Sequence, residues 1–172
     1  KTMSLQLPAV PLFATVATNY YDVGVVILDQ PVAGIAPAQL PSPALLSQLK
    51  KERILEGGHA QGAYFKSVGY GGTLTSWPPP VIDYDRIRRW SESEFASLTQ
   101  TSLHLFQRAV FDESGSCFGD SGGPLFWTDH DGKEIVVAVT STGDAQCVAT
   151  GFNYRVDVPE ILEWIYSQFP PE

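Results

Sequence analysis

Hydrophobic residues along this chain come mostly in short runs, or alternate with polar residues, as in half-buried β-strands. Such runs predict strands at positions 65–70, 103–106, 124–127, 135–139 and 152–156, and a buried strand from Val23 to Leu28. The pair Asp131-Gly132 predicts a hairpin turn before the strand at 135–139. The overall pattern therefore favours an all-β barrel or sandwich.

Two segments have helical spacing instead. Leucines at 45, 46 and 49 follow Ser42-Pro43, which offers an N-cap and a proline at the first helical position. Gly57-Gly58 is expected to end this short helix. Near the end of the chain, Asp157 and Pro159 precede apolar residues at helical spacing, which predicts a capped amphipathic helix.

The remaining segments predict connections. Residues 31–43 are rich in proline and lack periodicity, so we expect an extended connector. Gly71-Gly72 and the three prolines at 78–80 predict a turn and a loop. The charged stretch 83–94 is ambiguous, and we expect its arginines to form a solvated face.

Composition and charge exclude several functional classes. A chain of 172 residues, 44% of them hydrophobic, fits one globular domain and excludes disorder for the bulk of it. Lys and Arg number 11 and Asp and Glu 19, so the net charge of −8 has the wrong sign for binding nucleic acid or an anionic membrane. The apolar runs are also too short to span a bilayer.

The two cysteines, Cys117 and Cys147, cannot by themselves form a four-ligand zinc site. Either they pair, which implies an oxidising compartment, or they are two buried thiols. Composition leaves both alternatives open.

One serine stands in a glycine-rich segment, from Gly115 to Pro124. A turn of this kind can direct the N–H groups of Gly119 and Ser121 toward one point beside the Ser121 hydroxyl, as an oxyanion hole requires. The alternative is an ordinary glycine-rich hairpin. For a serine in such a loop alone, that alternative would be preferred.

The complete string Gly-Asp-Ser-Gly-Gly-Pro at 119–124 resembles the nucleophile signature of the trypsin/chymotrypsin family of serine proteases. The resemblance implies an all-β, chymotrypsin-like double β-barrel with a C-terminal α-helix. It also implies a serine endopeptidase that hydrolyses polypeptide substrates through an acyl-enzyme, without a metal or an organic cofactor.

The same resemblance assigns roles to individual residues. Ser121 would be the nucleophile, and the N–H groups of Gly119 and Ser121 would form the oxyanion hole. Residues 21–28 resemble the strand that begins with the triad aspartate, which makes Asp22 that residue. Ser141, in a segment that resembles the substrate-pairing strand, would support Asp22. In this family Asp120 pairs with a freed N-terminus and so shapes the oxyanion hole.

A substrate pocket is also implied. Gly115 would form its floor, Ser116 would add a hydroxyl, and Gly143 and Gly151 would form its walls. Because such a floor carries no side chain, we expect a preference for large apolar or aromatic residues before the cleaved bond. Cys117 and Cys147 match a disulfide of the family, which favours secretion.

Two features depart from the family pattern. No histidine precedes Asp22, and the three that follow it, at 59, 104 and 130, are expected to be structural or solvated. Lys1-Thr2 is also not a freed hydrophobic N-terminus. We therefore expect a C-terminal portion of a longer protease that is inactive alone.

In that portion, residues 1–30 would belong to the first barrel and 31–63 to the connector between the barrels. Residues 64–172 would form the complete second barrel and the helix. The alternative is a non-catalytic homologue that acts as a binding or scaffold protein. A proteinaceous inhibitor or a propeptide as a further partner is left open.

Overall fold

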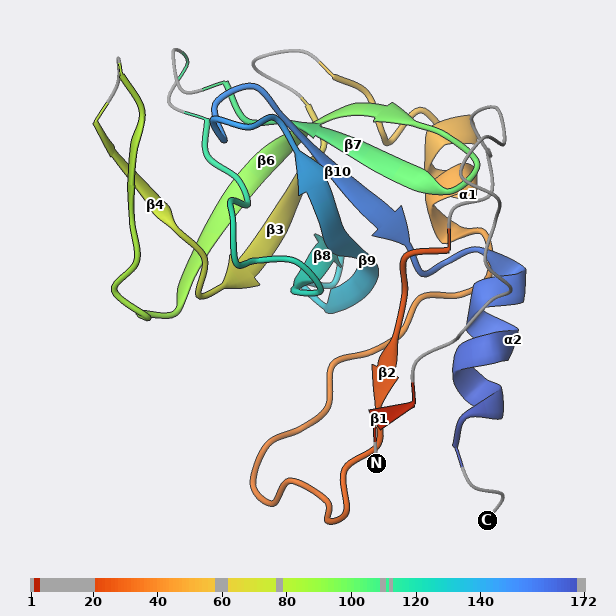
Figure 1. Cartoon of the computed structure of the whole chain (residues 1–172). Helices are drawn as coiled ribbons and strands as arrows, with labels where there is room; N and C mark the ends of the chain where they lie inside the picture. Colours follow the sequence, from red (N-terminus) through yellow and green to blue (C-terminus); the bar gives the residue numbers. More distant parts are fainter. Residues whose placement is uncertain are drawn as a thin grey trace, which may run out of the picture.

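A computed structural model describes residues 2–3, 21–57, 62–76, 79–108, 111 and 113–169. Six antiparallel strands close a barrel in the order β10-β7-β6-β3-β8-β9, with β9 pairing back onto β10 (Figure 1). The barrel strands are β3 (Tyr64–Gly69), β6 (Arg89–Leu98), β7 (Ser102–Phe106), β8 (Pro124–Thr128), β9 (Glu134–Gly143) and β10 (Thr150–Arg155). Together with the helix α2 (Pro159–Ser167), this barrel confirms the predicted fold class.

The barrel strands form where the sequence alternates. In β7, Leu103 and Leu105 are buried while His104 between them is half-buried on the other face. β3, β7, β8, β9 and β10 each contain most or all of a predicted strand. Gly132, with φ +78°, lies in the predicted turn between β8 and β9. The predicted strands are therefore confirmed wherever one face of the strand is apolar.

β6 is the barrel strand that the hydrophobic pattern did not identify. Its residue Glu94 is completely buried, and Arg108 donates to the Glu94 carboxylate over 2.7 Å. Glu94 pairs with the exposed Tyr64, so it lies on the face of β6 opposite to the core residue Phe95. A buried charge on that face and the polar Ser93 on the core face interrupt the apolar alternation, and the ion pair makes the burial of Glu94 tolerable. The three arginines of the adjoining stretch, at 86, 88 and 89, are exposed, as expected.

Next to the barrel, β4 (Thr73–Ser76) and β5 (Val81–Asp83) form a two-stranded hairpin. The hairpin extends away from the barrel, at the far left of Figure 1. The sequence predicted only a turn and a loop there, because prolines interrupt the segment. In the structure, Pro79 and Pro80 lie in the turn just before β5.

The predicted buried strand at 23–28 is wrong in its length and its burial. The strand β2 contains only Val25–Val26, which pairs with β1 (Thr2–Met3) outside the barrel. Val23 and Val25 pack against the cluster around Tyr154, whereas Val26 is 68% exposed. Only one face of this segment is covered by described residues, so its other apolar side chains face solvent.

The first helix begins and ends at different residues from those predicted. The helix α1 (Leu45–Lys51) starts after Ala44, whose φ of +59° lies outside helical conformation, so Pro43 is not its first residue. It ends well before Gly57, because Arg53 adopts a left-handed φ of +61°. Both ends are therefore set by backbone turns, and not by the predicted cap or glycines.

Asp157 has a different role from the predicted cap of α2. The N-cap of α2 is Val158, without a side-chain hydrogen bond, although Pro159 does occupy the first turn. The Asp157 carboxylate instead accepts a hydrogen bond of 2.9 Å from the N–H of Leu46, in the first turn of α1. Asp157 therefore stabilises α1, which is distant in the sequence, and not the adjacent helix α2.

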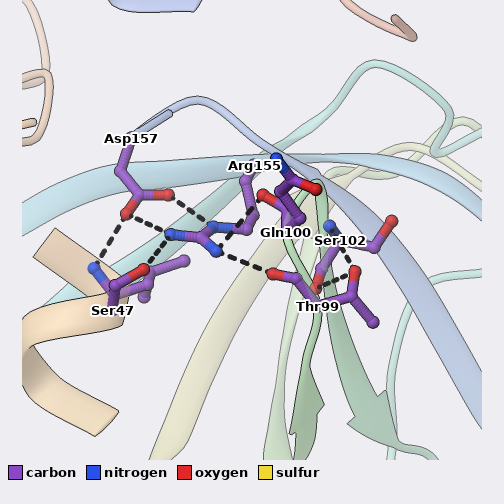
Figure 2. A network of polar contacts seen from close by, with 7 residues as sticks. Ser47, Thr99, Gln100, Ser102, Arg155 and Asp157 are labelled. Carbon is purple, nitrogen blue, oxygen red and sulfur yellow. Dashed lines mark hydrogen bonds and ion pairs between the residues drawn. The ribbon is translucent and has the colours of Figure 1, made fainter. Parts of the chain in front are cut away.

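Arg155 connects the same aspartate to the barrel (Figure 2). Its guanidinium donates to both oxygens of Asp157 over 2.8 Å, to Ser47 Oγ over 2.9 Å and to the Thr99 carbonyl over 2.7 Å. Arg155 and Asp157 are 4% and 0% exposed. The network fixes α1 against the end of β10 and the β6–β7 turn.

Candidate active site

Ser121 lies in an exposed turn immediately before β8. Two backbone hydrogen bonds hold the turn against Thr140 of β9. The N–H of Gly122 donates to the Thr140 carbonyl over 2.8 Å, and the N–H of Thr140 donates to the Gly123 carbonyl over 3.0 Å. Gly119 has a φ of +96°, which a side chain would disfavour. The serine is therefore presented to solvent on a loop with a fixed backbone.

Two backbone donors beside Ser121 are unoccupied. Neither the N–H of Gly119 nor that of Ser121 donates a hydrogen bond to any residue that the structure describes. Most exposed N–H groups bind water, and two adjacent ones next to a hydroxyl can instead stabilise an oxyanion. The predicted oxyanion-hole donors are thus available for a ligand.

The carboxylate of Asp120, in the same loop, is fixed by two backbone N–H groups. Its carboxylate accepts hydrogen bonds from the N–H of Gly71 over 2.7 Å and from the N–H of Cys117 over 2.9 Å. It lines a cavity of about 260 Å³, to which the start of the β4–β5 hairpin also contributes. The predicted pairing of Asp120 with an N-terminus concerns Lys1, which lies outside the described residues.

Cys117 and Cys147 form a disulfide, with their Cα atoms 5.3 Å apart. It joins the serine loop to the loop between β9 and β10. Of the two alternatives for these cysteines, the structure therefore shows the pair. The backbone of Cys147 has a φ of +55°, so its loop is held in an uncommon conformation.

Asp22 and Ser141, which are far apart in the sequence, are joined by a side-chain hydrogen bond. The Ser141 hydroxyl, near the end of β9, donates a hydrogen bond to Oδ2 of Asp22, which lies just before β2. Ser141 is half-buried, and Asp22 is exposed. The structure therefore brings together the two residues that the sequence assigned to the triad aspartate and its support.

A cavity of about 330 Å³ opens between the serine loop and the end of β9. Ser121 and Ser141 both line it, together with the predicted pocket residues Ser116 and Gly143. Asp22 reaches this region through its hydrogen bond to Ser141. With Cys117 and Cys147, six of the predicted site residues therefore surround one space, and Asp22 is hydrogen-bonded to its wall.

The predicted pocket floor differs from expectation. Gly115 and Gly151 are not on the wall of this cavity, and the side chain of Gln107 occupies the space beside them. The role of Gly115 as a pocket floor therefore stays a prediction, and Gly115 lines the cavity that Asp120 also lines. The sequence analysis missed Gln107, although it continues the inward alternation of Leu103 and Leu105 at the end of β7.

Asp144 closes the loop that forms one side of the cavity. Its carboxylate accepts hydrogen bonds of 2.9 to 3.1 Å from four backbone N–H groups, those of Gln146, Val148, Ala149 and Thr150. Burial alone would raise the pKa of Asp144, but these four donors outweigh it and hold the pKa below its ordinary value. The negative charge of Asp144 is thus stabilised by the backbone N–H groups of its own loop.

The two described histidines make other contacts. The His104 ring packs edge-on against Phe152, with centroids 4.4 Å apart, and its Nδ1 lies 3.0 Å from Ser97 Oγ. Burial lowers the pKa of His104. His130 is exposed in the β8–β9 turn, and His59 lies outside the described residues.

Two further findings concern the described part of the chain. It contains no group of three or more histidine, cysteine or acidic side chains arranged to hold a metal ion. Neither of its helices is long and apolar enough to cross a bilayer.

Comparison with protein families agrees with the geometry of the serine loop and the barrel. The sequence model of the family described as Trypsin matches residues 11–165. The match includes Asp22, Ser121 and Ser141, and it extends from the segment before β2 into α2. This chain therefore belongs to the trypsin family of serine proteases.

Proposed function

We propose that this chain carries the nucleophile, the triad aspartate and the oxyanion hole of a serine endopeptidase. The observation that carries the proposal is the hydrogen bond from Ser141 to Asp22 on the wall of the cavity that Ser121 also lines. If Ser121 only belonged to an ordinary glycine-rich hairpin, there would be no reason for Ser141 to hold the carboxylate of Asp22 beside the same cavity.

In this proposal Ser121 attacks the carbonyl carbon of the scissile peptide bond. The N–H groups of Gly119 and Ser121 stabilise the negative charge on the carbonyl oxygen. The proton of the serine hydroxyl passes to a general base, which then donates it to the leaving amine, and water releases the acyl group in a second step. Asp120 holds the loop through its bonds to the backbone of Gly71 and Cys117.

The general base is the part that these residues do not supply. His104 and His130 have the contacts described above, and neither precedes Asp22 as the family order requires. We propose that the base is a histidine outside these 172 residues, oriented by Asp22. Residues 1–30 would then belong to the first barrel, 31–63 to the connector and 64–172 to the second barrel with its helix.

Two aspects of the biology follow as parts of the proposal. The substrate would be a polypeptide, and a proteinaceous inhibitor or propeptide would bind the same cavity. The disulfide supports action in a secreted or extracytoplasmic, oxidising environment.

A non-catalytic homologue is the second candidate, since neither described histidine has a hydrogen bond to Ser121 among its contacts. Activity-based labelling distinguishes the two candidates. A fluorophosphonate should rapidly label Ser121 in the product of the natural gene and should label the 172-residue chain orders of magnitude more slowly, because the triad acts as a unit. Absence of labelling in both, with the Ser121→Ala variant as control, would favour the non-catalytic homologue. Rapid labelling of the 172-residue chain would show that one of its own histidines acts as the base.

A further inference from the structure

Tyr154 is a buried tyrosine whose hydroxyl has no part in the mechanism above. It lies in β10, and the residue is 3% exposed. Its hydroxyl oxygen is buried and has no hydrogen-bond partner among the described residues. Buried tyrosine hydroxyls normally have a partner, and an unpaired one costs free energy, so this hydroxyl calls for an explanation.

Tyr154 lies on the side of the β9–β10 pair that is covered by the segment leading into β2 (Figure 1). It pairs with Val139 of β9, and Val23 packs against the same apolar cluster. Asp22 directly precedes Val23, and Ser141, which donates to Asp22, follows Val139 by two residues in β9. Asp22 and Tyr154 therefore lie in the same region of the fold.

Three titratable groups face Tyr154. Tyr21 and Asp22 belong to the segment before β2, and Glu160 lies in the first turn of α2. Burial, and after it the negative charges that these three groups can carry, raise the pKa of Tyr154 to about 12. The phenol therefore keeps its proton at neutral pH, and that proton can be donated to an acceptor beside it.

Asp22 is the acceptor that the contacts favour. Ser141 donates to its Oδ2, while Oδ1 has no partner among the described residues. A carboxylate can accept several hydrogen bonds, and a bond to a charged acceptor is stronger than one to the hydroxyl of Tyr21. Glu160 is exposed, and no hydrogen bond to another described residue holds its carboxylate near the barrel.

We propose that Tyr154 is a positioning residue of the protease site, whose hydroxyl donates a second hydrogen bond to the carboxylate of Asp22. The proposal rests on the proposed function, in which Asp22 orients the general base. Asp22 is exposed and can turn, whereas Tyr154 is fixed by the pairing of β10 with β7 and β9. With Ser141 and Tyr154 as donors, the carboxylate has a fixed orientation and still has a lone pair for the base.

The hydroxyl proton of Tyr154 tests the contact in the 172-residue chain, without any need for hydrolysis. In protein labelled with ¹³Cζ-tyrosine, NMR should show this proton as a slowly exchanging signal at neutral pH, which Tyr154→Phe removes. We expect the signal to shift or disappear in Asp22→Ala, because its acceptor is gone. It should keep its position in Glu160→Gln and in Tyr21→Phe.

The rate of fluorophosphonate labelling tests the effect of Tyr154 on Ser121 in the natural gene product. Tyr154→Phe removes only the hydroxyl and should lower the rate of the covalent step at saturating probe about tenfold. The probe concentration that gives half of the maximal rate should stay unchanged, because the cavity keeps its shape. Tyr166→Phe, which removes an exposed hydroxyl on α2, is the matched control and should label at the parent rate.

A double-mutant cycle separates positioning through Asp22 from a general effect on the fold. In the Asp22→Ala background, Tyr154→Phe should slow labelling further by at most about twofold, because the hydroxyl no longer has a carboxylate to hold. A hydroxyl that acts only on the fold would slow labelling by the same factor in both backgrounds, and this result would overturn the inference.

The inference is also overturned if the hydroxyl proton exchanges too fast to be seen, if its signal responds to Glu160→Gln or Tyr21→Phe and not to Asp22→Ala, or if Tyr154→Phe labels at the parent rate. Rapid labelling of Ser121 in the parent, together with any of these results, would leave the proposed function in place. A signal that depends on Asp22, without labelling of Ser121 in the natural gene product, would contradict the proposed function and the positioning role together.

Discussion

The hydroxyl of Ser141 donates a hydrogen bond to the Asp22 carboxylate, although 119 residues separate them in the chain. The bond joins a segment outside the barrel to the end of β9, which forms part of the wall of the Ser121 cavity. It therefore holds an exposed carboxylate against a residue of the cavity wall.

Ser141 should accordingly act as a positioning residue. In the natural gene product, Ser141→Ala removes one hydrogen bond to a charged group and should lower kcat about tenfold or more. KM should change little, because the cavity keeps its shape. Ser141→Thr, which retains the hydroxyl, should restore most of kcat, and thermal unfolding of Ser141→Ala should match the parent. An equal loss in the Ala and Thr variants would show that the hydroxyl is not the reason.

The Arg155–Asp157 pair should be a major contribution to stability. Asp157→Ala leaves a buried guanidinium without its carboxylate and the N–H of Leu46 without its acceptor, so we expect a loss of about 3 to 5 kcal/mol in the free energy of unfolding. Ser47→Ala removes only one exposed contact of Arg155 and should cost about 1 kcal/mol. Urea denaturation measures both. Equal losses in the two variants would contradict the account of this network.

Asp144 should make part of the stability depend on pH. Because its folded-state pKa is lower than its ordinary value of 3.8, its charged form stabilises the folded state above that pH, and this contribution is lost as the pH falls through the folded-state pKa. Near neutral pH, Asp144→Asn should therefore be less stable than the parent by about 1 to 2 kcal/mol. The difference should vanish toward pH 2.

Urea denaturation between pH 2 and pH 7 tests this dependence. Asp131→Asn, which removes an exposed carboxylate in the β8–β9 turn, controls for the loss of one negative charge. A difference between Asp144→Asn and the parent that stays constant over the whole range would show that the carboxylate charge is not the cause.

The disulfide should stabilise the chain through the loop that it closes. For a sequence separation of 30 residues, the loop-entropy model gives roughly 3 to 4 kcal/mol, which the Cys117→Ala/Cys147→Ala variant should lose. Denaturation with and without reductant measures it, and mass spectrometry of the unreduced protein shows whether the bond is formed. Two alkylatable thiols in native, air-exposed protein would contradict both the bond and the argument for secretion.

The sequence predicted the fold well where a single periodicity dominates. Alternation placed β7 and β9, and the family string placed Ser121, because local patterns carry this information. Side-chain pairing across the fold could not be predicted in the same way. β6 does not alternate clearly because Ser93 on its core face is polar and Glu94 on its other face is buried with Arg108 as its partner. Asp157 resembles a cap of α2 although it binds α1.

The candidate site shows the same limit. The residues of the glycine-rich string follow from the motif, since its spacing is fixed, and the pairing of Cys117 with Cys147 follows from the resemblance to the family. Gln107 lies outside the motif, and its side chain lies beside Gly115 and Gly151 only because β7 pairs with β10. The exposure of Val26 likewise depends on which segments cover β2, which no local pattern specifies.

The central claim is that Ser121 and Asp22 are the nucleophile and the orienting carboxylate of one triad. The most direct test is kcat/KM of the natural gene product on a peptide substrate, compared with its Ser121→Ala and Asp22→Asn variants. The account predicts that Ser121→Ala lowers kcat/KM to background and that Asp22→Asn lowers kcat by about 10⁴. Hydrolysis by the Ser121→Ala variant at the rate of the parent would contradict it.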